Sequence, residues 1–155
     1  MSVHFEPAAA HDAEELVSLR IAAMRPSLER VGRFDPQRAR DRFLATFAPS
    51  STQHLVVDGR KVGFLVVRDE SDHLLLDHLY VHPEHQGKGI GAAALALVFT
   101  DADARLMPVR VGALTESASN RFYVRHGFEL IEETEWDNYY VRPPKDGRAN
   151  GGLAV

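Results

Sequence analysis

A run of closely spaced glycines follows an apolar segment near the middle of the chain. The residues run Val81-His-Pro-Glu-His-Gln-Gly-Lys-Gly-Ile-Gly-Ala92, and an alanine-rich stretch of helical character begins at Ile90. Glycine lets the backbone turn tightly and lets a ligand come close to the backbone N–H groups. The amino end of a helix adds a partial positive charge, and Lys88 brings a full one. The loop therefore predicts a binding site for an anion such as a pyrophosphate.

On the residues alone, the glycine loop is also compatible with two other interpretations. One is a turn into a helix that binds nothing. The other is a dinucleotide site, because Gly87 to Ala92 matches the pattern G-x-G-x-x-A. However, polar residues 82–86 separate the loop from its strand, and only Glu116 loosely matches the acidic position that a dinucleotide fold places after it. An ATP P-loop is not expected, because Gly-Lys is not followed by Ser or Thr.

Apolar periodicity and turn signals predict the elements that position this loop. We expect helices at 11–31, 35–47, 90–103 and 117–126, and strands at 3–7, 53–57, 61–68, 74–81, 109–114, 128–133 and 138–141. Pro26 predicts a kink or an early end in the first helix, Asp35 predicts the cap of the second, and Asp58-Gly59 predicts a tight hairpin turn. This order predicts an α/β (α+β) fold with a mixed, mostly antiparallel central sheet and helices on both faces.

The length and composition of the chain are those of a folded domain. Its 155 residues predict one domain over residues 1–143 and a flexible, Gly- and Pro-rich tail over residues 144–155. Hydrophobic residues make up 45% and charged residues 26%, which is the balance of an ordinary globular protein. The net charge of −4 argues against a nucleic-acid partner, since such proteins carry a basic face.

The chain contains no cysteine, which excludes disulfides, thiolate zinc sites and a cysteine nucleophile. Residues 1–10 lack the basic and apolar segments of a signal peptide. No apolar run reaches the roughly 18 residues that suggest a membrane span. We therefore expect a cytoplasmic protein without a membrane partner.

Two blocks of sequence together resemble the GNAT superfamily of N-acetyltransferases. Leu79-Tyr80-Val81 followed by Gln86-Gly-Lys-Gly-Ile-Gly91 is similar to the acetyl-CoA signature of that family, which is Arg or Gln, two residues, Gly, one residue, then Gly or Ala. A second block, Ser119-Asn-Arg-Phe-Tyr-Val-Arg-His-Gly-Phe128, resembles the later helix of the family and its ending. The two blocks stand in the expected order, and the resemblance extends over residues 3–141.

The resemblance implies acetyl-CoA as the co-substrate and no metal. The pyrophosphate would rest on the N–H groups of the glycine loop, and the pantetheine arm would pair with the preceding strand like an added strand. The cofactor-binding residues that it implies are Leu79, Tyr80, Val81, Gln86, Gly87, Lys88, Gly89, Ile90, Gly91, Ala92, Ser119, Asn120 and Phe122. The histidines at 73, 78, 82 and 85 do not predict a metal site, because His78 and His82 lie about 13 Å apart on an extended strand.

The resemblance also implies direct transfer of the acetyl group to a primary amine in a ternary complex. Tyr123 stands where the family places a tyrosine, whose phenol can protonate the departing thiolate. Asp77 is the predicted base for the amine, with His78 as the alternative, because an ionisable residue inside an apolar strand needs a reason. The family often has Asn where this chain has Glu116, and Ala where it has Ser119.

The acceptor is the least defined part of the sequence-based interpretation. A small-molecule amine and a peptide or protein amine both stay open, and a homodimer is a candidate assembly. The first two helices and the last two strands should wall the acceptor site, with a polar and aromatic set made up of Arg33, Phe34, Asp35, Trp136, Asp137 and Tyr139. The rival functions are a non-catalytic CoA-binding sensor and a dinucleotide-binding oxidoreductase.

Overall fold

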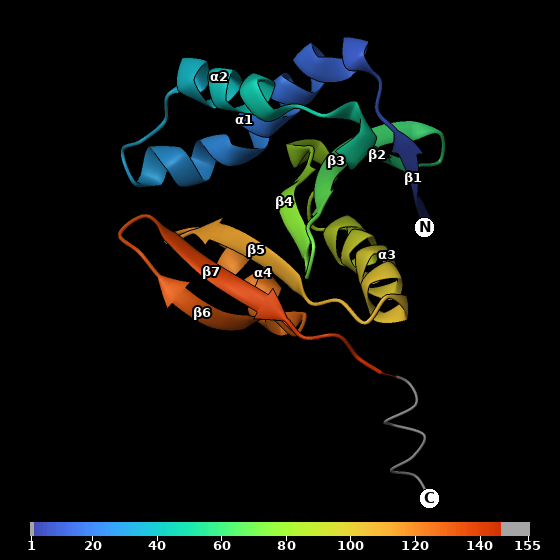
Figure 1. The fold of residues 1–155 in the computed structure, drawn as a ribbon. Helices are drawn as coiled ribbons and strands as arrows, with labels where there is room; N and C mark the ends of the chain where they lie inside the picture. The colour runs from blue at the N-terminus through green and yellow to red at the C-terminus, as the bar shows by residue number, and fades with distance from the viewer. Residues whose placement is uncertain (1, 147–155) are drawn as a thin grey trace, which may run out of the picture.

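A central sheet of seven strands organises the protein in the computed structural model, which describes residues 2–146 (Figure 1). The strand order across the sheet is β1-β2-β3-β4-β5-β7-β6. Every neighbouring pair is antiparallel except β4 and β5, which are parallel. The strands are β1 (Val3–Pro7), β2 (Thr52–Val57), β3 (Arg60–Asp69), β4 (Leu74–Val81), β5 (Val109–Leu114), β6 (Glu129–Glu133) and β7 (Asp137–Arg142).

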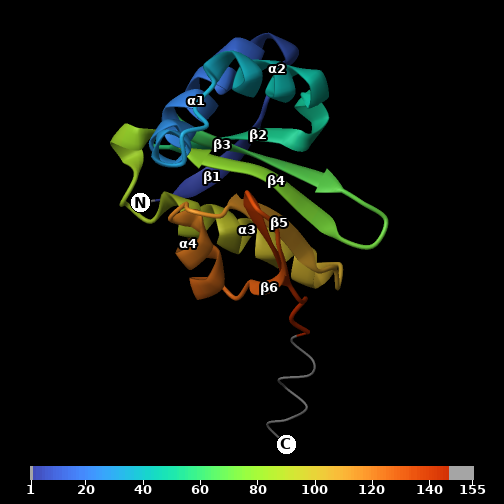
Figure 2. The same cartoon turned by 90° about the vertical axis from the view of Figure 1, so that its left-hand side faces the viewer.

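Helices cover both faces of the sheet, as Figures 1 and 2 show. One face carries α1 (Ala13–Arg30) and α2 (Pro36–Thr46), which bury Leu16, Phe43 and Phe64 in a shared core. The opposite face carries α3 (Ile90–Ala104) and α4 (Ser119–Arg125), and its larger core includes residues of α3, β4 and β5. Short 3-10 turns lie at Ala10–Asp12, Pro49–Ser51 and Pro83–His85. The fold class predicted from the sequence is confirmed.

The predicted boundaries lie within two residues of the observed ones. Helix α1 continues through Pro26 to Arg30, so the early end predicted at this proline is wrong. Residues on both sides of this proline lie against the sheet. Met24 contacts Tyr80 of β4, and Leu28 lines a cleft beside that strand. Packing therefore holds α1 continuous where local preference favours a break. Of the tail predicted at 144–155, residues 147–155 lie outside the described residues, so its expected flexibility stays a prediction.

Strand β4 separates from β5 halfway along its length. The parallel pairing covers only Leu74–Leu76 against Val109–Val111. At the same point the register with β3 shifts, because Val67 faces Leu76 while Val66 faces His78. Asp77 is therefore the extra residue of a β-bulge, which bends a strand and re-aims its side chains. The two strands diverge beyond it, and this leaves one edge of β4 without a neighbouring strand.

A buried contact between Asp12 and His54 joins the start of α1 to β2 and leads to a prediction about acid stability. The Asp12 carboxylate accepts a 2.8 Å hydrogen bond from the Ala9 N–H and lies 2.9 Å from Nε2 of His54. These contacts lower the pKa of Asp12 to about 2. A carboxyl whose folded pKa is depressed stabilises the fold above its unfolded pKa, and this stabilisation is lost as the pH falls through the folded value.

Asp12→Asn should therefore lower the free energy of unfolding by about 1–2 kcal/mol at pH 7, and the difference from wild type should shrink as the pH falls from about 4 to about 2. Urea denaturation at several pH values measures this. Asp72→Asn is the matched control, because it removes an exposed pair with His73 that should contribute little. An Asp12 variant whose deficit does not change with pH would contradict the assignment.

Candidate active site

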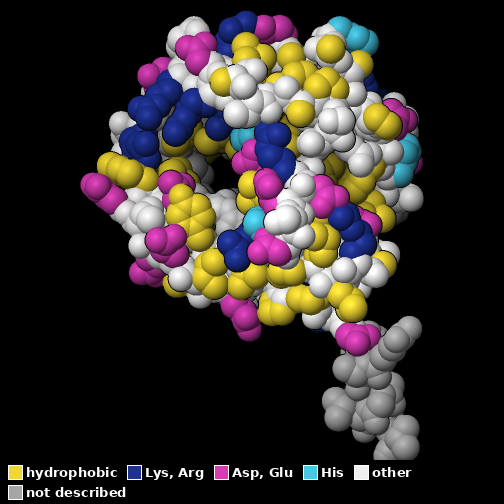
Figure 3. All heavy atoms as spheres, viewed as in Figure 1, with side chains coloured by type: hydrophobic (Ala, Val, Ile, Leu, Met, Phe, Trp, Pro, Cys, Tyr) yellow, Lys and Arg dark blue, Asp and Glu magenta, His cyan; other side chains and the backbone are white. Residues whose placement is uncertain are grey.

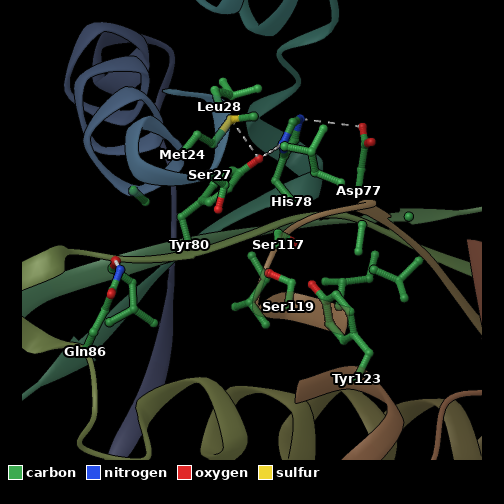
Figure 4. A pocket seen from close by; sticks show the side chains of 18 residues that line it. Met24, Ser27, Leu28, Asp77, His78, Tyr80, Gln86, Ser117, Ser119 and Tyr123 are labelled. Atoms are coloured by element: carbon green, nitrogen blue, oxygen red, sulfur yellow. Dashed lines mark hydrogen bonds and ion pairs between the residues drawn. The ribbon is translucent and has the colours of Figure 1, made fainter. Parts of the chain in front are cut away.

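A cleft opens where β4 and β5 separate, and it reaches the surface as the hollow seen in Figure 3. Five parts of the fold line it: the second half of α1, the bulged part of β4, the first residue of the glycine loop, the end of β5 with the loop that follows it, and α4. Figure 4 shows Tyr123 and Ser119 on one side of β4, and Met24 and His78 on the other. The gap between the strands thus connects the two faces of the sheet. The lining residues are Ala23, Met24, Ser27, Leu28, Leu76, Asp77, His78, Leu79, Tyr80, Val81, Gln86, Val111, Gly112, Ala113, Leu114, Ser117, Ser119 and Tyr123.

The glycine loop has the open geometry that an anion site requires. Gly87 and Gly89 adopt left-handed φ angles of 77° and 79°, which side-chain-bearing residues rarely take. A Cβ atom at either position would meet no protein atom within 4 Å, so the space beside the loop is open. Helix α3 begins at Ile90 with no side chain capping its N–H groups. The Gln86 side chain donates to the Val81 carbonyl at 3.0 Å and holds the loop against β4.

The third glycine of the loop has a packing role. A Cβ at Gly91 would lie 3.1 Å from Cζ of Phe122, so the start of α3 rests against a ring of α4. The same ring makes an edge-to-face contact with Tyr123, with centroids 5.5 Å apart. Phe122 therefore contacts both Gly91 and Tyr123, and it fixes the position of the glycine loop relative to Tyr123. Its side chain does not belong to the cleft lining, so the cofactor contact predicted for it stays a prediction.

Tyr123, the predicted acid, is buried in the wall of the cleft. It is 6% exposed, lines the cleft and packs its ring against Phe128 at 5.2 Å between centroids. Burial raises the pKa of Tyr123 well above that of a free tyrosine, so the hydroxyl keeps its proton at neutral pH. Beside it, Oγ of Ser117 is buried and has no hydrogen-bond partner among the described residues. Tyr80 is a second phenol of the lining, and burial raises its pKa as well. The cleft thus holds two phenols that keep their protons at neutral pH and one buried hydroxyl without a partner among the described residues.

Asn120 is held by hydrogen bonds from its side chain. Its Nδ2 group lies within hydrogen-bond distance of the carbonyls of Leu114, Thr115 and Ser117. Its Oδ1 atom accepts from Tyr140 at 2.7 Å, and it also accepts from Asn138. Protein groups therefore engage both ends of the amide and join α4 to β5 and β7, and the cofactor contact predicted for Asn120 stays a prediction.

Asp77, the predicted base, lines the cleft but is already paired. Its Oδ2 atom accepts a 2.8 Å hydrogen bond from Nε of Arg68, and the carboxylate side chain is 34% exposed. Arg68 also donates to the carbonyl of Thr46. The guanidinium therefore anchors the carboxylate at the rim of the cleft.

His78, the alternative base, lies deeper than Asp77. Its ring packs among Phe43, Phe64 and Tyr80, with centroid distances between 5.5 and 6.5 Å. Burial lowers the pKa of His78 to about 4, and the nearby charge of Asp77 only partly opposes this. The imidazole is thus neutral at physiological pH. The sequence predicted only a cofactor contact for Tyr80, whereas its side chain lines the cleft beside His78; their two-residue spacing on a strand was the available signal.

The predicted acceptor wall is partly assembled. The Arg33 guanidinium lies 4.3 Å from the centre of the Trp136 ring, and Arg30 donates to the carbonyl of Glu116. The end of α1 therefore contacts both the β5–α4 loop and the β6–β7 turn. Asp35 instead caps α2 by accepting from the N–H of Arg38, so it belongs to the helix rather than to the wall. Tyr139 packs its ring close to Gly112 of β5.

Neither a metal cluster nor a membrane helix is found over residues 2–146. In that range no group of three or more His, Cys, Asp or Glu side chains is placed to hold a metal ion. None of the helices described there combines the length and the apolar character that crossing a membrane would require.

Comparison with known protein families identifies the family of this chain. A family model described as an acetyltransferase (GNAT) domain matches residues 50–130, which is just over half of the chain. The chain belongs to the GNAT acetyltransferase family. Members of this family use acetyl-CoA as the acetyl donor. The matched region contains the glycine loop and Tyr123, so the GNAT assignment replaces the dinucleotide interpretation of the loop.

One curated protein and several solved structures are similar to this chain. The uncharacterized protein YrkN of Bacillus subtilis is 33% identical over 82 residues, which cover 51% of this chain and 44% of that protein. The match therefore spans less than half of that relative. Among solved structures, a PaiA N-acetyltransferase of Thermoplasma acidophilum in complex with coenzyme A gives a TM-score of 0.75 at 16% identity, over 92% of this chain and 99% of that one. An acetyltransferase of Thermus thermophilus gives 0.70 at 19% identity, over 92% and 97%. At such identities the likeness shows the fold.

The residues present fit acetyl-CoA on three observations. The glycine loop offers uncapped N–H groups in open space. One edge of β4 is free of strand pairing beyond Leu76, which is where an extended arm could pair. The buried Oγ of Ser117 lacks a partner and lies in the cleft lining. The three features therefore match, in order, the phosphates of acetyl-CoA, its extended arm and a polar group that the arm would bring into the cleft.

Proposed function

We propose that this chain is an N-acetyltransferase that moves the acetyl group of acetyl-CoA directly to a primary amine. The observation that carries the proposal is that one cleft is lined by Tyr123, by the part of β4 beyond its pairing with β5, and by Gln86, which begins the open glycine loop. Family membership supports acetyl transfer in general. The amine acceptor, the direct route and the roles of the residues are our proposal.

In this proposal the bound acetyl-CoA supplies an activated acetyl thioester. The N–H groups of Gln86–Ala92 hold the pyrophosphate, with Lys88 as a further charge. Backbone groups of Leu79, Tyr80 and Val81 pair with the extended arm. Ser117 and Ser119 offer hydroxyls at the floor of the cleft. No step passes through a cysteine, because the chain has none.

Two side chains manage protons in this proposal. Tyr123 donates its proton to the departing sulfur and regains a proton from solvent, and its raised pKa means that the hydroxyl still carries that proton at working pH. Asp77 receives the proton that the amine loses and exchanges it with solvent at the rim. Backbone N–H groups of the bulged strand near Leu79 can donate to the acyl oxygen as negative charge develops there.

Calorimetric titration tests the cofactor assignment. We expect saturable binding of acetyl-CoA at one site per chain, and no binding of NADH under the same conditions. An acceptor panel of small amines, peptides with free amino termini and lysine peptides should then release CoA thiol for at least one class. Preference for NADH would overturn the proposal, and acetyl-CoA binding without thiol release across the panel would favour a non-catalytic sensor.

A further inference from the structure

Arg20 of α1 is a buried cation without an acidic partner. The residue is 9% exposed, and none of the ion pairs found over residues 2–146 includes it. Its guanidinium donates to the carbonyl of Ala39, while its buried Nε atom has no hydrogen-bond partner in that part of the chain. A charge taken out of water without a partner is costly, so buried charges are almost always paired. The described residues therefore leave one buried cation without such a partner.

The hydrogen bond to Ala39 does not by itself explain a charge at this position. The bond joins α1 to α2 and uses only part of the donor capacity of a guanidinium. A neutral amide side chain could make the same bond without burying a charge. Arg142, the other buried arginine of the described residues, shows the usual solution, because it is 4% exposed and binds both carboxylate oxygens of Asp103. Arg20 differs from it in having no such partner.

Arg20 lies beside the cleft, behind the contact between Met24 and Tyr80. Met24 follows Arg20 by one turn of α1, so the two side chains share one face of the helix. Met24 and Tyr80 both line the cleft, and Figure 4 shows them on the α1 side of β4. Burial raises the pKa of Tyr80, and the charge and hydrogen bonding of Arg20 partly offset this rise, which puts the guanidinium next to the hydroxyl. An anion in the cleft can therefore reach Arg20 past these two side chains.

The other groups on the α1 side of the cleft do not neutralise Arg20. Asp77 carries a negative charge, but it accepts a 2.8 Å hydrogen bond from Arg68. His78 is neutral at physiological pH, because burial lowers its pKa to about 4. The Tyr80 hydroxyl has two long contacts, 3.3 Å to Nδ1 of His78 and 3.4 Å to a methionine sulfur, which is a weak acceptor. This side of the cleft therefore has a surplus positive charge and a phenol without a short hydrogen bond.

We propose that the acceptor is a small amine that also carries an anionic group, a carboxylate or a phosphate, which pairs with Arg20 and the Tyr80 hydroxyl. The inference rests on the proposed function and narrows its acceptor. The anion replaces the Met24 sulfur as the partner of the hydroxyl, and the unbranched, flexible methionine side chain turns aside. The cleft has a volume of about 190 Å³, below the roughly 300–1,000 Å³ of typical ligand pockets, and the cofactor arm must share it. A small molecule fits this space better than a segment of a folded protein.

The test compares two matched pairs of small amines as acceptors for the wild type. L-leucine and 3-methylbutylamine differ by a carboxylate, and O-phosphoethanolamine and ethanolamine differ by a phosphate. We expect kcat/KM to be about 10²-fold higher for at least one anionic amine than for its neutral counterpart, and the pair that shows the difference identifies the anionic group. Transfer only to neutral amines or to peptides would overturn this inference alone. A wild type that acetylates neither these amines nor the broader panel would overturn the proposed function and the inference with it.

Arg20→Met removes the charge and keeps an unbranched side chain. The preference for the anionic amine should fall about 10²-fold, mainly through KM, and Tm should stay the same or rise, because an unpaired buried charge does not stabilise the fold. Arg20→Lys is the second variant, in case the first folds poorly, and should lower the preference about 10-fold, since an ammonium lacks the planar fork. Arg40→Met removes an arginine of α2 that pairs with Glu14, and as the control it should not change the preference. An unchanged preference in both Arg20 variants would overturn the inference.

Discussion

Replacing Tyr123 by phenylalanine should lower kcat by about 10³-fold and leave acetyl-CoA binding unchanged. The change removes only the hydroxyl, and a positioned acid contributes about 10²–10⁴-fold. The ring contacts with Phe122 and Phe128 persist, so the packing of α4 against α3 should not change. The assay is thiol release under saturating acetyl-CoA, with calorimetry on the same sample. An effect on kcat without an effect on Kd locates the loss in the chemical step.

Thr100→Val is the control for Tyr123→Phe. It also removes one hydroxyl, which here donates to the Ala96 carbonyl within α3 and lies outside the cleft lining, so the change should not affect kcat. Because burial raises the pKa of Tyr123, its hydroxyl keeps the proton through the alkaline range of an ordinary assay. The kcat of the wild type should therefore show no decline from loss of this proton below about pH 10. Full activity in the Phe variant would place the acid elsewhere.

The elements and the anion loop were predictable because their signals are local. The hairpin turn follows from Asp58-Gly59, and both residues take the positive φ angles that the tight turn demands. Likewise, Gly87 and Gly89 adopt the left-handed geometry that their spacing indicated. Asp35 caps α2 as its neighbour Pro36 suggested. Each of these conformations depends on a few consecutive residues, so one sequence suffices to predict them.

The chemistry of the cleft was harder to predict because it depends on contacts between distant segments. The bulge at Asp77 exists only in the register between β3 and β4, and Arg68, which pairs with that carboxylate, stands on another strand. Asn120 is engaged by β5 and β7, which no local pattern indicates. Tyr80 was predicted as a cofactor contact, and its place beside His78 in the cleft follows from their two-residue spacing on β4. Residue types therefore suggest the candidates, whereas their partners come from segments far away in the sequence.

Gly89→Ala should weaken acetyl-CoA binding by about 10²-fold with only a small loss of stability. The φ angle of 79° costs an alanine about 1–2 kcal/mol, yet its Cβ meets no protein atom within 4 Å. That Cβ would stand in the space where the pyrophosphate is proposed to rest. Losing one or two charge-assisted hydrogen bonds costs about 1.5–3 kcal/mol each, which corresponds to the expected rise in Kd. Calorimetry gives the Kd, and thermal denaturation gives the stability.

Gly59→Ala separates the backbone strain from the loss of the anion site. Gly59 has a φ of 76° and equally open surroundings, but it lies in the β2–β3 turn away from the cleft. Its replacement should cost the same stability and leave the Kd unchanged. If both variants weaken acetyl-CoA binding equally, strain alone explains the effect and the loop has no special role. If only Gly89→Ala weakens binding, the result supports a pyrophosphate site on the N–H groups at the start of α3. Phe122 contacts both Gly91 of that helix and Tyr123, so the packing fixes the position of the phenol relative to the bound cofactor.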